Sequence, residues 1–162
     1  MVAMTDHEDE TRIFAELYPS LRRFAAVVGP IETDPDDLLQ EAVARTLRHH
    51  HLDELDHPGA YLRRTIVNLA SNERRSFAIR RRMLNRFTSD TAISTDDYPS
   101  DLADLCNVPP QERAALYLSE VEGYRYGEIG RSLGCSEAAA RKRAMRGRRR
   151  LADVLAEEVR HV

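Results

Sequence analysis

The sequence has no tryptophan, and phenylalanine and tyrosine supply only 6% of its 162 residues. Two cysteines, Cys106 and Cys135, are too few for a disulfide scaffold or for a metal site built from cysteines alone. No stretch approaches the roughly 18 consecutive apolar residues of a membrane span. The acidic first ten residues lack the cationic start and apolar run of a secretory signal. We therefore expect a cytoplasmic protein with an aliphatic core and no membrane insertion.

The alternation typical of β-strands is missing as well, and apolar residues recur at helical spacing throughout. In the first half this spacing predicts a helix over residues 10–28, a second from Asp34 to about residue 50, and a third that begins at Pro58. Asp34 is the expected N-cap of the second helix, and Pro35 its first helical residue. Residues 10–86 are thus predicted to form a small helical bundle.

Residues 107–158 are predicted to form a second helical domain. Two helices are expected over about residues 110–122 and 126–133, followed by a turn and a long basic helix that Ser136 caps. This is the pattern of a helix-turn-helix. At about 100° per residue, one side of the long helix faces the core and the opposite side is exposed. The inward side carries Ala140, Ala144, Gly147 and Leu151, and the outward side carries Ala138, Lys142, Met145 and Arg149.

Residues 87–106 differ in composition from both halves. They are rich in serine, threonine and aspartate, and they bury too little apolar surface to offset the entropy cost of ordering. We predict a flexible acidic linker here. The expected fold class is therefore all-α, with two small, separately folded helical domains at residues 10–86 and 107–158 on either side of this linker.

Charge is distributed very unevenly, although the formal charge of the whole chain is only −3. Residues 1–62 carry 13 acidic residues and five arginines, whereas residues 63–86 carry eight arginines and one glutamate. Residues 87–107 contain five aspartates and no basic residue, and residues 141–150 contain six arginines and one lysine. Two cationic blocks separated by an acidic spacer favour contact with a phosphate backbone at two places.

Residue patterns that carry chemistry are not found. No nucleophile with a neighbouring base, phosphate-binding loop or metal-ligand spacing is present, so we expect no enzymatic activity, no catalytic residue and no cofactor. The adjacent histidines His49, His50 and His51 would point in different directions on a helix, which disfavours a metal site. The expected function is therefore binding.

Segments in both halves resemble the sigma factors of bacterial RNA polymerase, specifically the small extracytoplasmic-function (ECF) group of the sigma-70 family. Residues 34–42 (DPDDLLQEA) are similar to the family signature D-x-E-D-L-V-Q-E-A. The other segments are residues 60–75 (AYLRRTIVNLASNERR), 108–116 (VPPQERAAL) and 121–130 (VEGYRYGEIG). The resemblance covers residues 12–86 (region 2) and 107–155 (region 4), with no region 3 between them.

The resemblance implies that the helix after Asp34 docks on the β′ subunit of core RNA polymerase. An acidic helix suits a partner surface rich in arginine, where polar contacts set orientation and on-rate. The positions that carry this role in the family correspond here to Asp37, Leu38, Gln40 and Glu41, with Leu39 and Val43 on the same helix.

The resemblance also implies that the third helix captures an unstacked base of the promoter −10 element. Asparagine suits this role because its amide offers both a donor and an acceptor to a base edge, and single-stranded bases expose those edges. A tyrosine stands where the family usually has tryptophan, which keeps an aromatic stacking surface. The matching positions are Tyr61, Arg64, Asn68, Asn72, Arg74 and Arg75.

For the −35 element, the matching positions lie on the long basic helix. They are Arg141, Lys142, Arg143, Met145 and Arg146, and Arg149 is added to this site because it lies on the outward side of the same helix. Arginine can bind guanine through two hydrogen bonds or bridge phosphates, and methionine can touch a thymine methyl group. Two departures from the family, Gly130 for alanine and Ala140 for valine or isoleucine, are expected to loosen the packing behind the DNA-facing side.

The resemblance as a whole implies an alternative sigma factor that directs promoter recognition and transcription initiation. Its expected partners are core RNA polymerase (the β′ and β subunits), promoter DNA and an anti-sigma factor. Binding two DNA sites through a tether would supply avidity that neither site has alone. Two alternatives stay open: a free-standing helix-turn-helix regulator that acts without polymerase, and an adaptor that binds polymerase without recognising promoters.

Overall fold

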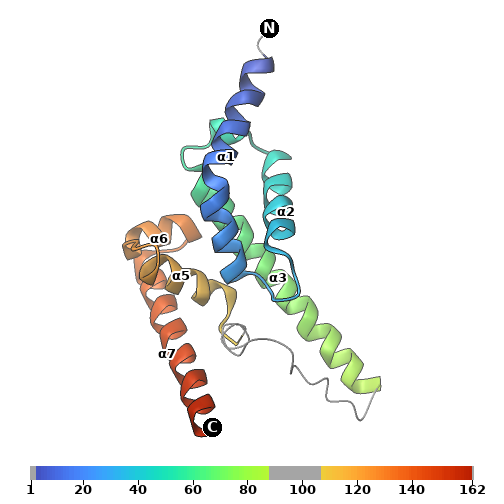
Figure 1. The fold of residues 1–162 in the computed structure, drawn as a ribbon, viewed down its shortest axis with the longest axis vertical. Coiled ribbons are helices and arrows are strands. Elements are labelled where there is room, and N and C mark those ends of the chain that lie inside the picture. The colour runs from blue at the N-terminus through green and yellow to red at the C-terminus, as the bar shows by residue number, and fades with distance from the viewer. Residues whose placement is uncertain (1–2, 88–106, 162) are drawn as a thin grey trace.

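The computed structural model of the chain describes residues 3–87 and 107–161, and in these ranges every regular element is helical (Figure 1). The predicted all-α class and the predicted order of helices are confirmed. None of the described helices combines the length and the apolar character of a membrane span. The elements are α1 (Ala3–Val28), α2 (Pro35–Leu47), the 3-10 helix η1 (Leu52–Glu54), α3 (Pro58–Phe87), α5 (Pro110–Glu120), α6 (Tyr126–Leu133) and α7 (Glu137–His161).

The N-terminal unit consists of α1, α2, η1 and α3. Asp34 caps α2 as predicted, because its side chain accepts a hydrogen bond from the backbone N–H of Asp36 at 2.8 Å. The predicted linker begins one residue too early, since Phe87 is still helical, and residues 88–106 of it lie outside the described part of the chain. The core of this unit is aliphatic apart from Phe24; it includes Leu21, Phe24, Val28, Leu38, Leu39, Leu52, Leu62 and Ile66.

The C-terminal unit consists of α5, α6 and α7, and α6 with α7 forms the predicted helix-turn-helix. Gly134 ends α6 in the left-handed conformation (φ 67°), which favours glycine. Ser136 then caps α7, where its hydroxyl oxygen accepts a hydrogen bond from the N–H of Ala139 at 3.1 Å. The predicted inward side of α7 is confirmed, since Ala140 and Ala144 are fully buried.

The two units pack directly against each other, contrary to the expectation of separately folded domains. Helix α1 lies against α5, and α3 lies against α5 and α6 (Figure 1). Buried residues of both units form one continuous apolar cluster. At the contact surface between the units, here called the seam, the rings of Phe24 and Tyr117 meet edge to face with centroids 6.1 Å apart. Helix α7 also packs closely against α5 and α6, so the contact between the units extends a core that the C-terminal helices already share.

Two buried arginines join the units at this seam. The Arg113 guanidinium donates hydrogen bonds to the backbone oxygens of Val27 (3.2 Å) and Gly29 (3.3 Å), at the C-terminal end of α1. That end carries unsatisfied carbonyl groups and a partial negative charge, both of which a cation stabilises. Arg63 lies over the ring of Tyr124, 5.5 Å from its centroid. Polar contacts thus fix the orientation of the units where apolar packing alone would not.

Two leucines of α2 differ in burial, and replacing them should therefore lower the stability of the protein by different amounts. Leu39→Ala removes a fully buried side chain, and we expect it to lower the free energy of unfolding by about 2–5 kcal/mol, as measured by urea denaturation. Leu47→Ala removes a side chain that is 43% exposed on the same helix and should cost less than about 1 kcal/mol. Equal losses in the two variants would contradict the placement of α2.

Candidate nucleic-acid and partner interfaces

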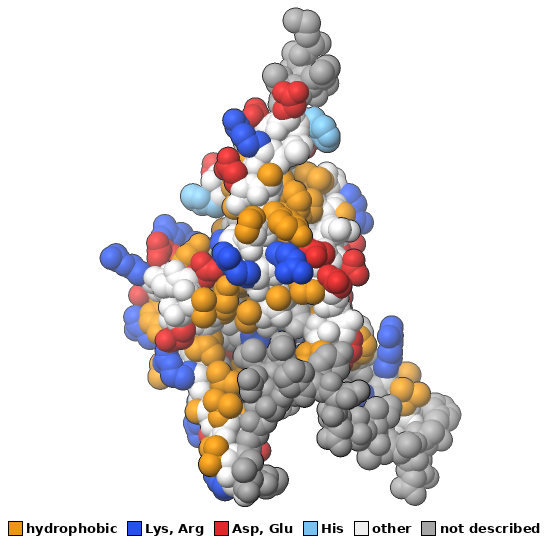
Figure 2. All heavy atoms as spheres, viewed as in Figure 1, with side chains coloured by type: hydrophobic (Ala, Val, Ile, Leu, Met, Phe, Trp, Pro, Cys, Tyr) orange, Lys and Arg blue, Asp and Glu red, His pale blue; other side chains and the backbone are white. Residues whose placement is uncertain are grey.

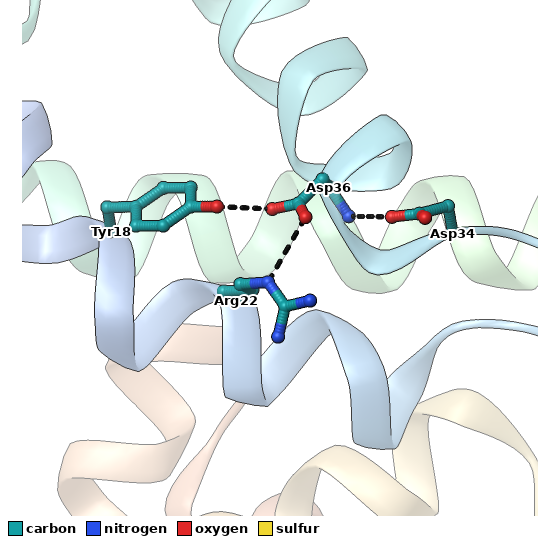
Figure 3. Close-up of polar contacts among 4 residues, drawn as sticks. All are labelled: Tyr18, Arg22, Asp34 and Asp36. Atoms are coloured by element: carbon teal, nitrogen blue, oxygen red, sulfur yellow. Dashed lines mark hydrogen bonds and ion pairs between the residues drawn. The ribbon is translucent and has the colours of Figure 1, made fainter.

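The start of α2 is held by a small polar network around Asp36 (Figure 3). The hydroxyl of Tyr18 donates to the carboxylate of Asp36 at 2.5 Å, and Nε of Arg22 donates to it at 3.1 Å. The hydrogen bond from Tyr18 and then that from Arg22 lower the pKa of Asp36 below its ordinary value, and the same bond raises the pKa of Tyr18. Asp36 therefore serves this chain's own fold and fixes the direction of α2.

The rest of α2 divides the predicted polymerase-binding residues into two groups. Asp37, Gln40 and Glu41 are exposed on its outer side. Leu38 is buried in the chain's own core, with 2% of its surface exposed, as is Leu39. The expectation that Leu38 and Leu39 contact the polymerase therefore needs correction. Their side chains pack α2 against α1 and α3. Of the predicted polymerase-binding residues, the polar ones are therefore available to a partner.

Glu41 is paired along the same helix. Its carboxylate accepts from Nε of Arg45 at 2.6 Å and lies 3.7 Å from Arg48, and the hydrogen bond from Arg45 lowers the pKa of Glu41. All three side chains are about half exposed, so these pairs contribute little to stability. The pairing keeps Glu41 ionised and extended along α2, where a basic partner surface can replace Arg45.

Helix α3 places three of the predicted −10 residues on one face. Tyr61, Asn68 and Asn72 recur at seven and four residues, within about 40° of one another around the helix axis. Both asparagines are exposed, and Tyr61 is half-buried with its ring edge to face against His50, centroids 5.2 Å apart. The amides have no hydrogen-bond partner among the described residues, and the tyrosine about two turns before them is held in place by His50.

The three arginines among the predicted −10 residues point in different directions from α3. Arg75 borders the asparagine face, whereas Arg74 points about 160° away from Asn72. Arg64 is exposed but lies against the C-terminal unit, because a Cβ added at Gly134 would come within 2.5 Å of its guanidinium carbon. In this arrangement Arg64 and Arg74 contribute to the seam between the units, which the sequence pattern did not indicate.

The seven cations of residues 141–150 fall into two groups on α7. Arg141 pairs with Glu137 at 3.3 Å and lies over the ring of Tyr126, with 5.4 Å to its centroid. Arg148 pairs with Glu120, and Nε of Arg150 contacts the carboxylate of Glu112 at 2.9 Å. Arg148 and Arg150 thereby attach α7 to α5, while Lys142, Arg143, Arg146 and Arg149 have no acidic partner among the described residues.

The free cations define the exposed side of α7, which the helical spacing predicted. Lys142, Met145 and Arg149 point outward, and 57% of the Met145 surface is exposed. Figure 2 shows basic side chains along α7 and at the exposed end of α3, and acidic ones around the start of α2. A helix that follows a tight turn and presents cations with one apolar group is suited to the major groove of DNA.

One expected weakness in the helix-turn-helix is absent. A Cβ added at Gly130 would approach the carbonyl oxygen of Cys135 to 2.6 Å, so glycine lets the turn pass close to α6. The expectation that Gly130 loosens the packing is therefore wrong. At Gly147 a Cβ would lie 2.9 Å from the Glu112 carbonyl oxygen, which shows that α7 approaches α5 equally closely.

A second polar cluster joins the N-terminal part of α1 to η1. One carboxylate oxygen of Glu10 lies 2.9 Å from Nδ1 of His51 and accepts from the N–H of Leu52 at 3.1 Å, and Asp53 lies close by. Hydrogen bonding to Glu10, and then the charges of Glu10 and Glu54, raise the pKa of His51. The Glu10 oxygen already has two partners, so the cluster is adequately explained as a contact that fixes η1.

The geometry described above defines a class of protein: an all-helical, two-unit DNA-binding protein with a helix-turn-helix in one unit and an exposed asparagine face in the other. Comparison with known proteins agrees. Residues 13–78 match the family described as sigma-70 region 2, and residues 105–151 match sigma-70 region 4.

Known relatives are similar over nearly the whole chain. The RNA polymerase sigma factor CarQ of Myxococcus xanthus is 31% identical, over 90% of this chain and 88% of that protein. The ECF sigma factor SigE of Mycolicibacterium smegmatis is 32% identical over 83% of this chain and 57% of its own length, and SigM of Mycobacterium tuberculosis is 27% identical over 89% and 76%. The chain belongs to the ECF group of the sigma-70 family and is an alternative sigma factor, which directs transcription initiation.

A solved structure shares the fold. The sigma factor RpoE of Bartonella quintana, determined in a co-crystal with the anti-sigma factor NepR, aligns with a TM-score of 0.59 at 21% identity. The alignment covers 92% of this chain and 98% of that one. At this identity the likeness establishes the helical arrangement of the two regions.

The Asp36 network predicts a pH dependence of stability. Because folding lowers the pKa of Asp36, the ionised carboxylate stabilises the protein above its ordinary pKa of 3.8, and this contribution is lost as the pH falls through the lower folded value. We expect the melting temperature of the native chain to exceed that of Asp36→Asn near neutral pH. The difference should shrink as the pH falls below about 4. Asp37→Asn, at an exposed neighbour, is the control, and an equal pH dependence in that variant would contradict the assignment.

Proposed function

We propose that this sigma factor binds core RNA polymerase through the outer side of α2, captures a base of the opened −10 element on α3, and contacts the −35 element through α7. The observation that carries the proposal is the exposed face of α3, where two asparagines one turn apart share a side of the helix with an aromatic ring about two turns before them. Such a face suits an unstacked base, which offers an edge for hydrogen bonds and a ring for stacking.

Polymerase docking is proposed for Asp37, Gln40 and Glu41, because these are the exposed polar residues of the helix that the family uses. The buried leucines and the Asp36 network support them by fixing the helix. The chain itself supplies recognition, and the chemistry of RNA synthesis belongs to the polymerase. A cytoplasmic location follows from that partner and remains a prediction.

Promoter contact at two places requires the units to separate. The −10 and −35 elements are centred about 25 base pairs apart, which corresponds to roughly 85 Å of duplex at 3.4 Å per base pair. In this structure the two units enclose a hollow between them. It is lined by Arg74 and Arg75 from α3 and by Arg143 and Arg146 from α7. The described conformation is therefore the closed form of the protein, and polymerase binding would have to open the seam at Arg113 and Tyr117.

An anti-sigma partner is proposed for the closed form. The structural relative was solved with an anti-sigma factor, and its fold matches this chain across both regions. A partner that covers both units would hold them together and hide α2 from polymerase. The free-standing regulator is the less favoured alternative, because residues 13–78 match a region that such a regulator does not need.

The −10 assignment is tested by in vitro transcription with purified core polymerase. The double variant Asn68→Ala and Asn72→Ala should lose about tenfold or more in open complexes, since a good contact to a base edge contributes about 1–3 kcal/mol. Binding to core polymerase, measured separately, should be unchanged. Asn85→Ala, at an exposed asparagine further along α3, is the control. If the double variant transcribes like the control, the asparagine face does not hold a base.

Because Arg148 is paired with an acidic residue and Arg149 is not, substitutions at these two neighbouring positions should affect DNA binding differently. Arg149→Gln removes an unpaired cation from the outward side, and −35 duplex binding should weaken by about 1–3 kcal/mol if it contacts a base, or lose about one unit of salt slope if it contacts a phosphate. Arg148→Gln removes a cation that is paired with Glu120 and should change DNA binding much less. Binding is measured by fluorescence anisotropy at several salt concentrations, and equal losses would contradict the division.

A further inference from the structure

The seam between the units contains a hollow lined by arginines from both of them. Its volume is about 550 Å³, and it lies between α3, the start of α5 and α7. Arg74 and Arg75 line it from α3, and Arg143 and Arg146 line it from α7. The other described residues that line it are Ser71, Ala78, Pro109, Pro110, Gln111 and Glu112.

The residues that the structure describes do not neutralise the four arginines. None of them forms a hydrogen bond or ion pair with another described residue, and Glu112, the one acidic side chain among the described lining residues, contacts Arg150. Closing the seam therefore brings four like charges to the walls of one space, where their repulsion opposes the closed form. An anion inside the hollow would convert this repulsion into attraction.

The chemistry of the walls favours phosphate groups. Guanidinium groups match phosphate oxygens with paired hydrogen bonds, and the hydroxyl of Ser71 and the amide of Gln111 add neutral donors. The volume lies within the range of about 300–1,000 Å³ that is typical of small-molecule sites. Pro109 and Pro110 add an apolar surface beside the cations. A DNA duplex, whose major groove alone is about 12 Å wide, is too large for this space.

We propose that the hollow is a binding site for a small oligophosphate ligand, such as a nucleoside di- or triphosphate, which exists only when the two units are closed. Bound phosphates would bridge α3 and α7 and stabilise the closed form. The consequence for transcription rests on the proposed function: the ligand would occupy arginines that otherwise contact promoter DNA, and it would oppose the opening that two-site binding requires. The site itself depends only on the described geometry.

The test is titration of the full chain with inorganic tripolyphosphate by isothermal calorimetry. We expect one site per chain. The double variant Arg74→Gln and Arg143→Gln, which removes one cation from each wall, should weaken binding by about tenfold or more, since each charge-assisted hydrogen bond contributes substantially. Arg81→Gln with Arg82→Gln removes the same charge from α3 outside the hollow and should change affinity by less than about twofold.

Two outcomes would overturn the proposal: several equivalent sites per chain, or equal losses in the two double variants, either of which indicates attraction to overall charge alone. Circular dichroism and the melting temperature of each variant establish that it is folded, and Arg75→Gln with Arg146→Gln provides a second pair of wall residues. Replacement of the five aspartates between residues 90 and 104 by asparagine should leave tripolyphosphate affinity within about twofold. A tenfold gain would show that these aspartates occupy the hollow, and the proposal would then be wrong.

The measurement requires neither polymerase nor promoter DNA. If tripolyphosphate fails to bind while transcription responds to the asparagine variants, only the oligophosphate site is excluded. If it binds and transcription does not respond, only the promoter assignment is excluded. The two proposals can therefore fail separately.

Discussion

The placement of Arg113 is the constraint on which the arrangement of this protein depends. Only 5% of its surface is exposed, so its charge has been removed from water, and a buried cation is tolerated only where hydrogen bonds replace its hydration. The backbone oxygens at the end of α1 supply those bonds. Because α1 ends at that point, α5 can dock in one orientation, which places Tyr117 against Phe24 and sets α7 across the hollow from α3.

This docking decides which arginines are structural and which are available. Arg63 and Arg113 are buried in the seam and join the two units, and Arg148 and Arg150 attach α7 to α5. The outward side of α7 and the asparagine face of α3 keep their polar groups free. A chain with a formal charge of −3 thereby presents two cationic surfaces, because its acids are concentrated in residues 1–62 and 87–107.

Local features of this fold followed from sequence patterns, whereas the seam did not. Asp34, Ser136 and Gly134 act on backbone groups a few residues away, and the inward side of α7 follows from helical spacing, so each was predictable. The contact between Arg113 and Gly29 spans 84 residues, and no periodicity in one sequence indicates it. Leu38 is a different case, because its spacing on α2 places it in the core although its family role suggested exposure.

The interactions that stabilise the closed form differ in kind from the repulsion between arginines that opposes it. The seam consists of packed rings, of which Phe24 is fully buried, and of hydrogen bonds, and salt screens these contacts little. The arginines around the hollow are largely exposed, and their repulsion decays over a Debye length of about 8 Å at physiological ionic strength. Anions therefore favour closure both by screening and by binding, and an extended polyanion that pulls α3 and α7 apart favours opening. The same arginines thus make the balance between the two forms depend on which polyanion the protein meets.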